Sequence, residues 1–197
     1  MRLPPRIENS LIAEVGLTAL LREDLRNHYG DWTRPGFRAI ATYRLGAWAR
    51  QLKNPILRAS LSLIHRSAFR FVRNIYGIEL YYTAKIGRRL HIAHQGAIVI
   101  HEHVTIGDDC IIRQGVTIGI GGLDRNWDAI RPKIGNRVDI GAGAMIVGSI
   151  RIGDDVRIGP NAVVIIDVPP NTTALAPPAR LLPGAVTRLP TATTGTS

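Results

Sequence analysis

The aliphatic residues in the second half of the chain recur at every sixth position. The series from Ile134 onward is Ile134, Ile140, Ile146, Ile152, Ile158 and Val164. An amphipathic helix repeats every 3.6 residues or so and a half-buried strand every two, so an interval of six residues corresponds to three strand periods. The pattern therefore predicts short strands, with the chain turning a corner after each group of six residues.

The same series extends toward the N-terminus in two blocks, separated by steps of eight and sixteen residues: Ile86, Ile92 and Ile98, then Ile106, Ile112 and Ile118. Glycine follows many of these anchors, where we expect the backbone to bend without room for a Cβ. A second inward position lies four residues after seven of the anchors and holds a small or aliphatic residue: Cys110, Val116, Val138, Ala144, Ile150, Val156 and Ala162. Such hexapeptide repeats build a parallel β-helix, three repeats to a triangular coil, and twelve anchors predict about four coils. The spacing leaves the hand of the helix open.

The first part of the chain has helical spacing instead. Apolar residues follow a helical period after Ser10, and Pro35 and Pro55 each open a further helical segment. We therefore predict a mainly β protein with three parts. Residues 1–78 form a small N-terminal helical cap and oligomerisation region, residues 79–170 form the β-helix, and residues 171–197 form an extended segment and a mobile tail.

The length and composition of the chain limit where the protein can be located and which chemistry its cysteine can perform. The chain of 197 residues contains no run of 18 apolar residues, and the charged residues near its start are not those of a signal peptide, so we expect a cytoplasmic protein. Its one cysteine, Cys110, falls on an inward repeat position, which favours a small buried hydrophobic residue over a nucleophile.

The net charge of +10 comes from 22 arginines and 3 lysines against 15 acidic residues. Because aromatic content is 6% and no nucleic-acid fold signature occurs, we expect no nucleic-acid partner; a nucleotide-bearing cosubstrate explains part of the excess. The third helical segment is basic, with Arg58, Arg66, Arg70 and Arg73. We favour packing of this segment on a neighbouring subunit, with peripheral contact to an anionic membrane as the alternative.

Several motifs of the repeat region resemble those of the serine acetyltransferases. The resemblance runs from about residue 77 to residue 182 and implies a left-handed β-helix, a homotrimer or dimer of trimers, and acetyl-CoA as donor, with no metal. The matching stretches are Ala84-Lys85-Ile86-Gly87, His94, Gln114-Gly115-Val116-Thr117-Ile118-Gly119, Pro132-Lys133-Ile134-Gly135, Ile140-Gly141-Ala142-Gly143-Ala144, Thr172-Thr173-Ala174 and Pro178-Ala179-Arg180.

Acetyl transfer to a hydroxyl requires a base, because an alcohol is a poor nucleophile at neutral pH. His94 matches the catalytic histidine of the family, and Glu79 lies where the family has the acidic residue that orients it. Glu102 also falls on an acidic position of the family and is predicted to brace the site. His91, His101 and His103 crowd this region, and this leaves a zinc enzyme of the γ carbonic anhydrase type as an alternative, with histidines from two subunits.

The resemblance also places acetyl-CoA in a groove between two subunits. Gly121 and Gly122 of the loop after the sixth anchor, together with Gly141 and Ala142, are the predicted backbone contacts for the donor, although Gly141 equally suits a corner of the coil. Arg157 stands where the family often has a lysine near the nucleotide and is the predicted cation for its phosphates.

The chain departs from the family on the acceptor side. Ala93 replaces the aspartate before the catalytic histidine, Tyr81-Tyr82 replaces a His-Pro pair, and only Arg131 remains as a candidate partner for a substrate carboxylate. The acceptor is therefore either L-serine or a sugar or saccharide precursor. The terminus lacks the isoleucine with which many family members engage cysteine synthase, so we do not expect that partner. A non-enzymatic trimeric scaffold is the third class of function.

Overall fold

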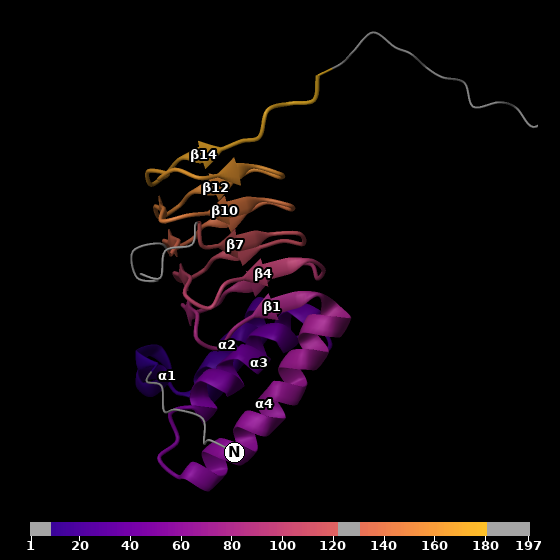
Figure 1. Cartoon of the computed structure of the whole chain (residues 1–197), viewed down its shortest axis with the longest axis vertical. Coiled ribbons are helices and arrows are strands. Elements are labelled where there is room, and N and C mark those ends of the chain that lie inside the picture. Colours follow the sequence, from indigo (N-terminus) through magenta and orange to yellow (C-terminus); the bar gives the residue numbers. More distant parts are fainter. Residues whose placement is uncertain (1–8, 122–130, 181–197) are drawn as a thin grey trace, which may run out of the picture.

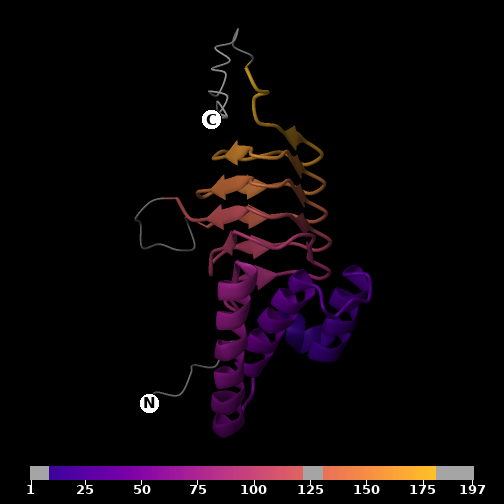
Figure 2. The ribbon, with the colours of Figure 1, turned by 90° about the vertical axis from the view of Figure 1, so that its right-hand side faces the viewer.

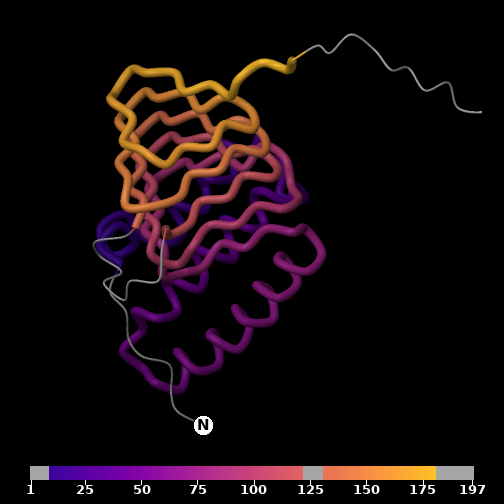
Figure 3. Tube along the Cα trace, turned by 45° about the horizontal axis from the view of Figure 1, so that its top comes forward, coloured from indigo at the N-terminus to yellow at the C-terminus, as the bar shows by residue number. Residues whose placement is uncertain are grey.

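The described part of this computed structural model comprises residues 9–121 and 131–180, and there the chain forms a column of stacked strands on four helices (Figure 1). Successive coils of the column lie parallel and close together along their whole length (Figure 3).

Three parallel sheets make up the three faces of the column, which we name after their first strands. The β1 face contains β1 (Ile78–Leu80), β4 (Ile98–Ile100), β7 (Thr117–Gly119), β10 (Met145–Val147) and β13 (Val163–Val164). The β2 face contains β2 (Lys85–Ile86), β5 (Thr105–Ile106), β8 (Lys133–Ile134) and β11 (Arg151–Ile152). The β3 face contains β3 (His91–Ile92), β6 (Ile111–Ile112), β9 (Asp139–Ile140), β12 (Arg157–Ile158) and β14 (Thr173–Ala174).

The strand register explains how the hexad phase survives the central loop. On the β2 face Ile134 pairs with Ile152, eighteen residues later, and this is the length of one regular coil. Across the loop Ile112 pairs with Ile140, twenty-eight residues later. The insertion of ten residues between β7 and β8 therefore leaves the register of the following strands unchanged.

The predicted aliphatic ladder is the core of the column. All twelve anchors are buried, and so are the small and aliphatic residues predicted to point inward beside them, including Cys110. The irregular step of eight residues after Ile98 also has a structural cause. Both Ile98 and Ile100 of β4 are fully buried, and Ile100 rather than Ile98 pairs with the anchor Ile118. Ile100, six residues before Ile106, is therefore the register position of β4, and the two extra residues lie in the corner between β3 and β4.

The glycines that follow the anchors serve close packing rather than a special bend. Gly107 has no positive φ, but a Cβ there would lie 2.5 Å from the carbonyl oxygen of Gly135 in the next coil. The left-handed conformation falls two residues later, where Asp109 and Arg137 have φ values of 57° and 54°. The expected bend was therefore placed two residues too early, and the glycine is needed because adjacent coils approach each other closely.

The four helices are α1 (Ser10–Val15), α2 (Leu17–Asn27), α3 (Pro35–Ala49) and α4 (Pro55–Tyr76). Pro35 and Pro55 occupy first-turn positions, where the missing N–H has no intrahelical partner to lose. The Asn54 side chain caps α4 by accepting from Ile56 N and Leu57 N, and Gly77 ends it in the left-handed conformation at φ 64°. The predicted helical segments are thus confirmed, with the chain passing from α4 directly into β1.

Side chains of the helices form hydrogen bonds with backbone groups of the first coil, at the end of the column where no further coil pairs with it. The Tyr43 hydroxyl donates to Ala84 O at 2.8 Å and accepts from Ile86 N at 3.2 Å. Arg44, fully buried, pairs with Asp24 at 3.0 Å and donates to the carbonyl oxygens of Ile86 and Gly87. The backbone edge of the first coil would otherwise be an unpaired strand edge, so these contacts dock the helices onto the column.

His28 makes the corresponding contact on the β3 face. Its Nε2 accepts from Ile92 N at 3.2 Å, while its Nδ1 lies 2.7 Å from Asp24 O. Burial lowers the pKa of His28 to about 4, so the ring is neutral near pH 7 and one nitrogen is able to accept a hydrogen bond.

Among the helices, α4 packs mainly against α3, along one of its sides (Figure 2). Its opposite side carries a stripe of exposed apolar side chains at helical spacing: Ile56, Leu57, Leu63, Ile64, Phe71 and Ile75. α4 contains no acidic residue and four arginines. Neither of the two partners considered for this basic segment, a neighbouring subunit or a membrane surface, is present in a single chain, so both stay predictions.

The predicted fold class is confirmed: the protein is mainly β, its parallel strands form a solenoid of about four turns behind N-terminal helices, and this is consistent with a left-handed β-helix. The three-part division of the chain stays a prediction, and the expected tail lies outside the described residues after position 180. Among the described helices, none has the length and apolar character that crossing a membrane requires.

Candidate active site

The predicted acidic residue Glu79 lies at the base of the β1 face. It is the middle residue of β1, between the buried Ile78 and Leu80, so strand alternation turns its side chain outward. Its carboxylate accepts a short hydrogen bond from the Tyr81 hydroxyl, and this bond is the main cause that raises the pKa of Tyr81. Tyr81 in turn packs against Phe69 of α4, with ring centroids 5.3 Å apart. The tyrosine that replaces a family histidine therefore holds Glu79 in place.

The predicted base His94 lies in the corner between β3 and β4. Its side chain is exposed, and the described residues of one chain give it no hydrogen bond or ion pair. In particular, no hydrogen bond joins His94 to Glu79 within the described part of the chain. The imidazole nitrogens are accordingly accessible from outside the column, where a substrate or a neighbouring subunit approaches.

The four clustered histidines of the sequence separate in the structure. His91 turns toward the helices, where its ring lies 4.7 Å from that of His28, and burial lowers its pKa. His101 and His103 pack together in the next corner, with ring centroids 5.4 Å apart. Among the described residues no group of three or more His, Cys, Asp or Glu side chains is arranged to hold a metal ion.

Glu102 belongs to this second corner, after β4. Its Oε2 accepts from the Thr83 hydroxyl at 3.4 Å, and its Oε1 lies 3.9 Å from His103 Nε2. Glu102 also contributes to the raised pKa of Tyr81, so it lies in the electrostatic neighbourhood of the Tyr81 and Glu79 pair. The structure thus brings Glu79 and Glu102 to one corner and places His94 at the other edge of β4.

The predicted donor contacts lie higher on the column. A Cβ at Gly141 would lie 2.6 Å from Pro160 N in the next coil, so close packing of coils explains this glycine. Ala142 is half-buried, and its carbonyl oxygen accepts from Asn161 N. Gly121 approaches Gly148 of the adjacent coil, while Gly122 lies outside the described residues. Backbone contacts to a donor are therefore limited to groups that the coil hydrogen bonds leave accessible.

The remaining predicted residues occupy different surroundings. Arg157 is exposed at the outer position of β12, beside the buried Ile158, so its guanidinium reaches solvent on the β3 face. Arg131 is half-buried just before β8. Ala93, half-buried next to His94, offers no charge to a substrate.

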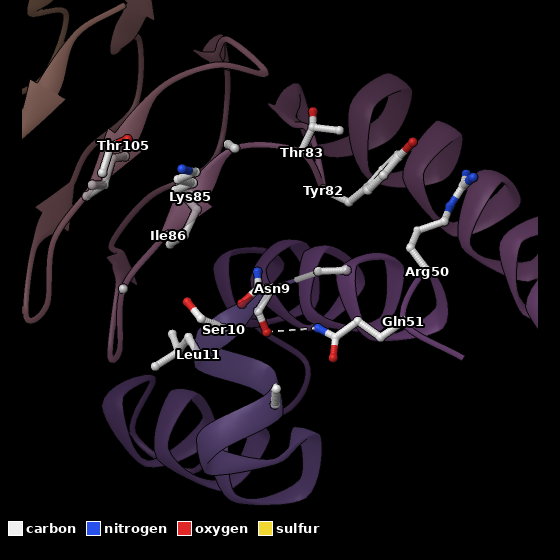
Figure 4. Close-up of a pocket in the computed structure, with 15 residues that line it drawn as sticks. Asn9, Ser10, Leu11, Arg50, Gln51, Tyr82, Thr83, Lys85, Ile86 and Thr105 are labelled. Atoms are coloured by element: carbon white, nitrogen blue, oxygen red, sulfur yellow. Dashed lines mark hydrogen bonds between the residues drawn. The ribbon is translucent and has the colours of Figure 1, made fainter. Parts of the chain in front are cut away.

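A cavity of about 690 Å³, which the sequence did not predict, lies where the helices meet the first two coils (Figure 4). Its lining comes from four segments that are far apart in the sequence, residues 9–13, 47–51, 82–87 and 105–106. None of the residues predicted to be catalytic or to bind substrate lines it. Only the docking of the helices brings these segments together, so no motif or spacing signals the cavity.

Known proteins share both the repeats and the whole architecture. Residues 131–165 match the family model for bacterial transferase hexapeptide (six repeats). A serine acetyltransferase of Helicobacter pylori strain J99 is 41% identical over 148 residues, covering 75% of this chain and 81% of the relative. The chain belongs to the serine acetyltransferase family.

Solved structures of serine acetyltransferases agree with that assignment. The enzyme of Brucella abortus strain S19 in complex with coenzyme A has a TM-score of 0.69 and 29% identity, over 86% of this chain and 69% of that one. Soybean serine acetyltransferase complexed with serine has a TM-score of 0.69 and 30% identity, over 88% of this chain and 72% of that one. Serine acetyltransferases are acyltransferases, so the predicted enzyme class, an acetyl-CoA-dependent O-acetyltransferase, is confirmed.

Proposed function

We propose that this chain transfers the acetyl group of acetyl-CoA to the hydroxyl of L-serine, with His94 as general base. The observation that carries the proposal is the accessible imidazole of His94 in a chain 41% identical to a serine acetyltransferase. A base must reach the proton that it removes, and an exposed histidine that no described residue of its own chain binds meets that condition.

The reaction needs one proton transfer in each direction. His94 takes the hydroxyl proton as the acceptor oxygen bonds to the thioester carbonyl carbon. The tetrahedral intermediate then collapses, the carbon–sulfur bond breaks, and the imidazolium returns the proton to the leaving sulfur. The products are the acetyl ester and the free thiol of CoA.

Glu79 is proposed to orient His94 and to stabilise the imidazolium. Tyr81 already donates to one carboxylate oxygen, which leaves the other for the ring N–H. Hydrogen bonds in unliganded sites are often long and tighten only when substrate binds. The lack of a hydrogen bond between His94 and Glu79 in the free chain is therefore compatible with this role. Glu102 supports the same corner through its contacts with Thr83 and His103.

The donor is proposed to bind in a groove between two protomers of a homotrimer or dimer of trimers. The β1 face presents a row of exposed apolar side chains, Val99, Met145 and Val163, that a neighbouring copy would cover. Arg157 is an exposed cation suited to a phosphate, and Gly121, Gly122, Gly141 and Ala142 are proposed to flank the pantetheine arm.

L-serine is proposed as the acceptor because the chain belongs to the serine acetyltransferase family. One observation in the sequence does not favour this acceptor. L-serine carries an ammonium group as well as a carboxylate; Arg131 suits the carboxylate, but Ala93 has no charge for the ammonium. An uncharged sugar hydroxyl does not need that partner, so transfer to a sugar or saccharide precursor is the second candidate. A zinc enzyme that shares histidines between subunits stays a minor alternative, as does a scaffold without activity.

We further propose that the protein works in the cytoplasm, without a metal, and without cysteine synthase or nucleic acid as partners. Peripheral membrane contact through α4 stays an alternative to its packing on a neighbouring subunit.

An acceptor panel tests the proposal. Release of CoA thiol is followed with L-serine, homoserine, a free sugar and a nucleotide sugar, in the wild type and in Ala93→Asp. We expect turnover with L-serine and a lower KM for L-serine in Ala93→Asp, because the new carboxylate pairs with the ammonium. Turnover with a sugar alone, unimproved by the substitution, would replace L-serine as the acceptor. Zinc-dependent activity without thiol release would contradict the proposed reaction.

A further inference from the structure

Arg50 is a buried cation that no described residue neutralises. It ends α3 as the C-cap residue and is only 7% exposed. Its guanidinium has no hydrogen bond or ion pair with any residue that the structure describes, and its Nε is fully enclosed without a partner. Arg50 does contact the Tyr82 ring, whose centroid lies 4.6 Å from the Arg50 Cζ. An isolated buried charge of this kind is strongly unfavourable unless something compensates it.

The neighbours of Arg50 add to the imbalance. Burial lowers the pKa of Arg50, and the charges of Arg66 and Arg58 on α4 act in the same direction. Among the described neighbours that influence this pKa, Tyr82 alone acts in the opposite direction, and none is a carboxylate. The Arg50 guanidinium, with two further arginines and an aromatic ring as neighbours, therefore favours the binding of an anion.

Arg50 lines the cavity between the helices and the first two coils. In Figure 4 Arg50 and Tyr82 lie on one side of the cavity, and Lys85 of β2 lies on the other. No acidic residue is among the described residues that line it, and the two charged side chains among them are both cations. The remaining lining combines apolar side chains such as Leu11 and Ile106 with hydroxyl and amide groups such as Ser10, Thr83, Thr105 and Gln51.

We propose that this cavity binds a small organic anion, a carboxylate or a phosphate monoester, with its charged group on Arg50 and the rest of the ligand extending toward Lys85 on the opposite side. The planar guanidinium donates to two anion oxygens at once, and Lys85 supplies a second charge. The volume of about 690 Å³ lies within the ordinary range of small-molecule sites, and the polar lining provides hydrogen-bonding groups for the body of the ligand.

This site is separate from the proposed catalytic base, since His94 and Glu79 do not line it. Its walls belong to α1, to the end of α3 and to the first two coils, so a bound anion contacts the helical cap and the β-helix together. Binding therefore stabilises the docking of the cap on the column, and the anion acts as a stabilising effector rather than as an acetyl acceptor.

Thermal unfolding of the full-length protein tests the proposal, with citrate, inorganic phosphate and glucose 6-phosphate as probes at constant ionic strength. At about ten times Kd we expect at least one probe to raise the Tm of the wild type saturably, by about 3 to 6 °C. Arg50→Met is expected to lose this response and, without any anion, to unfold no earlier than the wild type, because it removes an unpaired buried charge. Arg70→Met, an exposed arginine of α4, is the matched control and keeps the response.

Two further variants make the test decisive. Lys85→Met, at an exposed position of β2, is expected to weaken binding of the anion about tenfold, and His94→Ala is expected to leave it unchanged. Loss of the response in His94→Ala but not in Arg50→Met would move the anion to the catalytic site and overturn the proposal. A non-saturating rise of equal size in all variants, as anions excluded from protein surfaces produce, would also overturn it.

Discussion

At the scale of single residues, the hydrogen bond from Tyr81 to Glu79 links the fold to the proposed chemistry. Tyr81 follows β1 directly and packs on Phe69 of α4, so its hydroxyl is fixed from two sides. The carboxylate that is proposed to orient His94 is therefore itself oriented by a tyrosine. The family pattern has histidine at this position, so the arrangement belongs to this chain.

Tyr81→Phe is expected to lower kcat about tenfold, because a hydrogen bond to a charged group contributes about 1.5 to 3 kcal/mol to its placement. KM for acetyl-CoA should change little, since Tyr81 lies away from the proposed donor contacts. Steady-state kinetics measure both quantities. Tyr76→Phe is the control, because its hydroxyl binds Arg38 in the cap instead. Equal kcat values for Tyr81→Phe and the wild type would remove Tyr81 from the site.

His65 makes stability depend on pH. It is 3% exposed, its two ring nitrogens have no partner among the described residues, and burial lowers its pKa to about 4, helped by the charges of Arg50 and Arg66. The unfolded chain takes up this proton near pH 6.5, whereas the folded chain resists it down to about pH 4. The neutral His65 ring therefore makes its full contribution to the free energy of unfolding above pH 6.5, and this contribution is lost as the pH falls toward 4.

His65→Leu is expected to flatten that dependence. The free energy of unfolding, measured in urea at several pH values between 7.5 and 4.5, should fall less steeply in the variant, by a total of about 1 to 3 kcal/mol. Part of the slope stays, because His28 has a similarly lowered pKa. Identical slopes for the two proteins would show that His65 is protonated in the folded chain.

At the scale of elements, the helices dock through polar side chains rather than through an apolar face alone. Arg44 and Asp24 are both completely buried, and Arg44 also holds two carbonyl oxygens of the first coil. Removing one partner of a buried ion pair leaves the other charge without compensation. The pair therefore sets the stability of the joint between cap and column.

Arg44→Met is expected to lower the free energy of unfolding by about 3 to 5 kcal/mol. The matched control is Arg137→Met, which breaks the exposed two-bond pair of Arg137 with Asp155 and should cost less than about 1 kcal/mol. Urea denaturation at pH 7.5 measures both. Equal losses for the two variants would contradict the role given to the buried pair.

The repeat was predictable from the sequence and the joint was not, for a physical reason. Anchors such as Ile134 and Ile152 recur because every coil repeats the same packing, so the interval itself carries the structure. Arg44 and His28 each make a contact that occurs once, between segments some forty to sixty residues apart, and no period marks it. Histidines that are neighbours in the sequence, such as His91 and His94, were grouped together although β-helix geometry turns them to different surroundings.

At the scale of the whole molecule, many of the exposed apolar residues lie in two series that a monomer leaves uncovered. One is the row of Val99, Met145 and Val163 on the β1 face, and the other is the stripe of α4. The proposed groove for the donor requires two protomers, so assembly and activity should be lost together.

Light scattering coupled to size-exclusion chromatography tests this coupling. The wild type should have three or six times the chain mass of 21.6 kDa. Met145→Glu, at an exposed position of β10, is expected to shift the protein toward monomer and to lower turnover in parallel, because a charge is buried at the interface. Arg151→Glu, on the β2 face, is the control for a new carboxylate elsewhere on the column. A monomeric wild type with full activity would contradict the shared groove.

The central claim, that His94 is the base for acetyl transfer, is tested most directly by its replacement with alanine. CoA thiol release from acetyl-CoA with L-serine is compared in the wild type, His94→Ala and Gln95→Ala, the last being an exposed neighbour in the same corner. We predict a fall in kcat of about 10²- to 10⁴-fold for His94→Ala, with unchanged circular dichroism and mass, and near-normal turnover for Gln95→Ala. Full turnover of a folded His94→Ala protein would contradict the account.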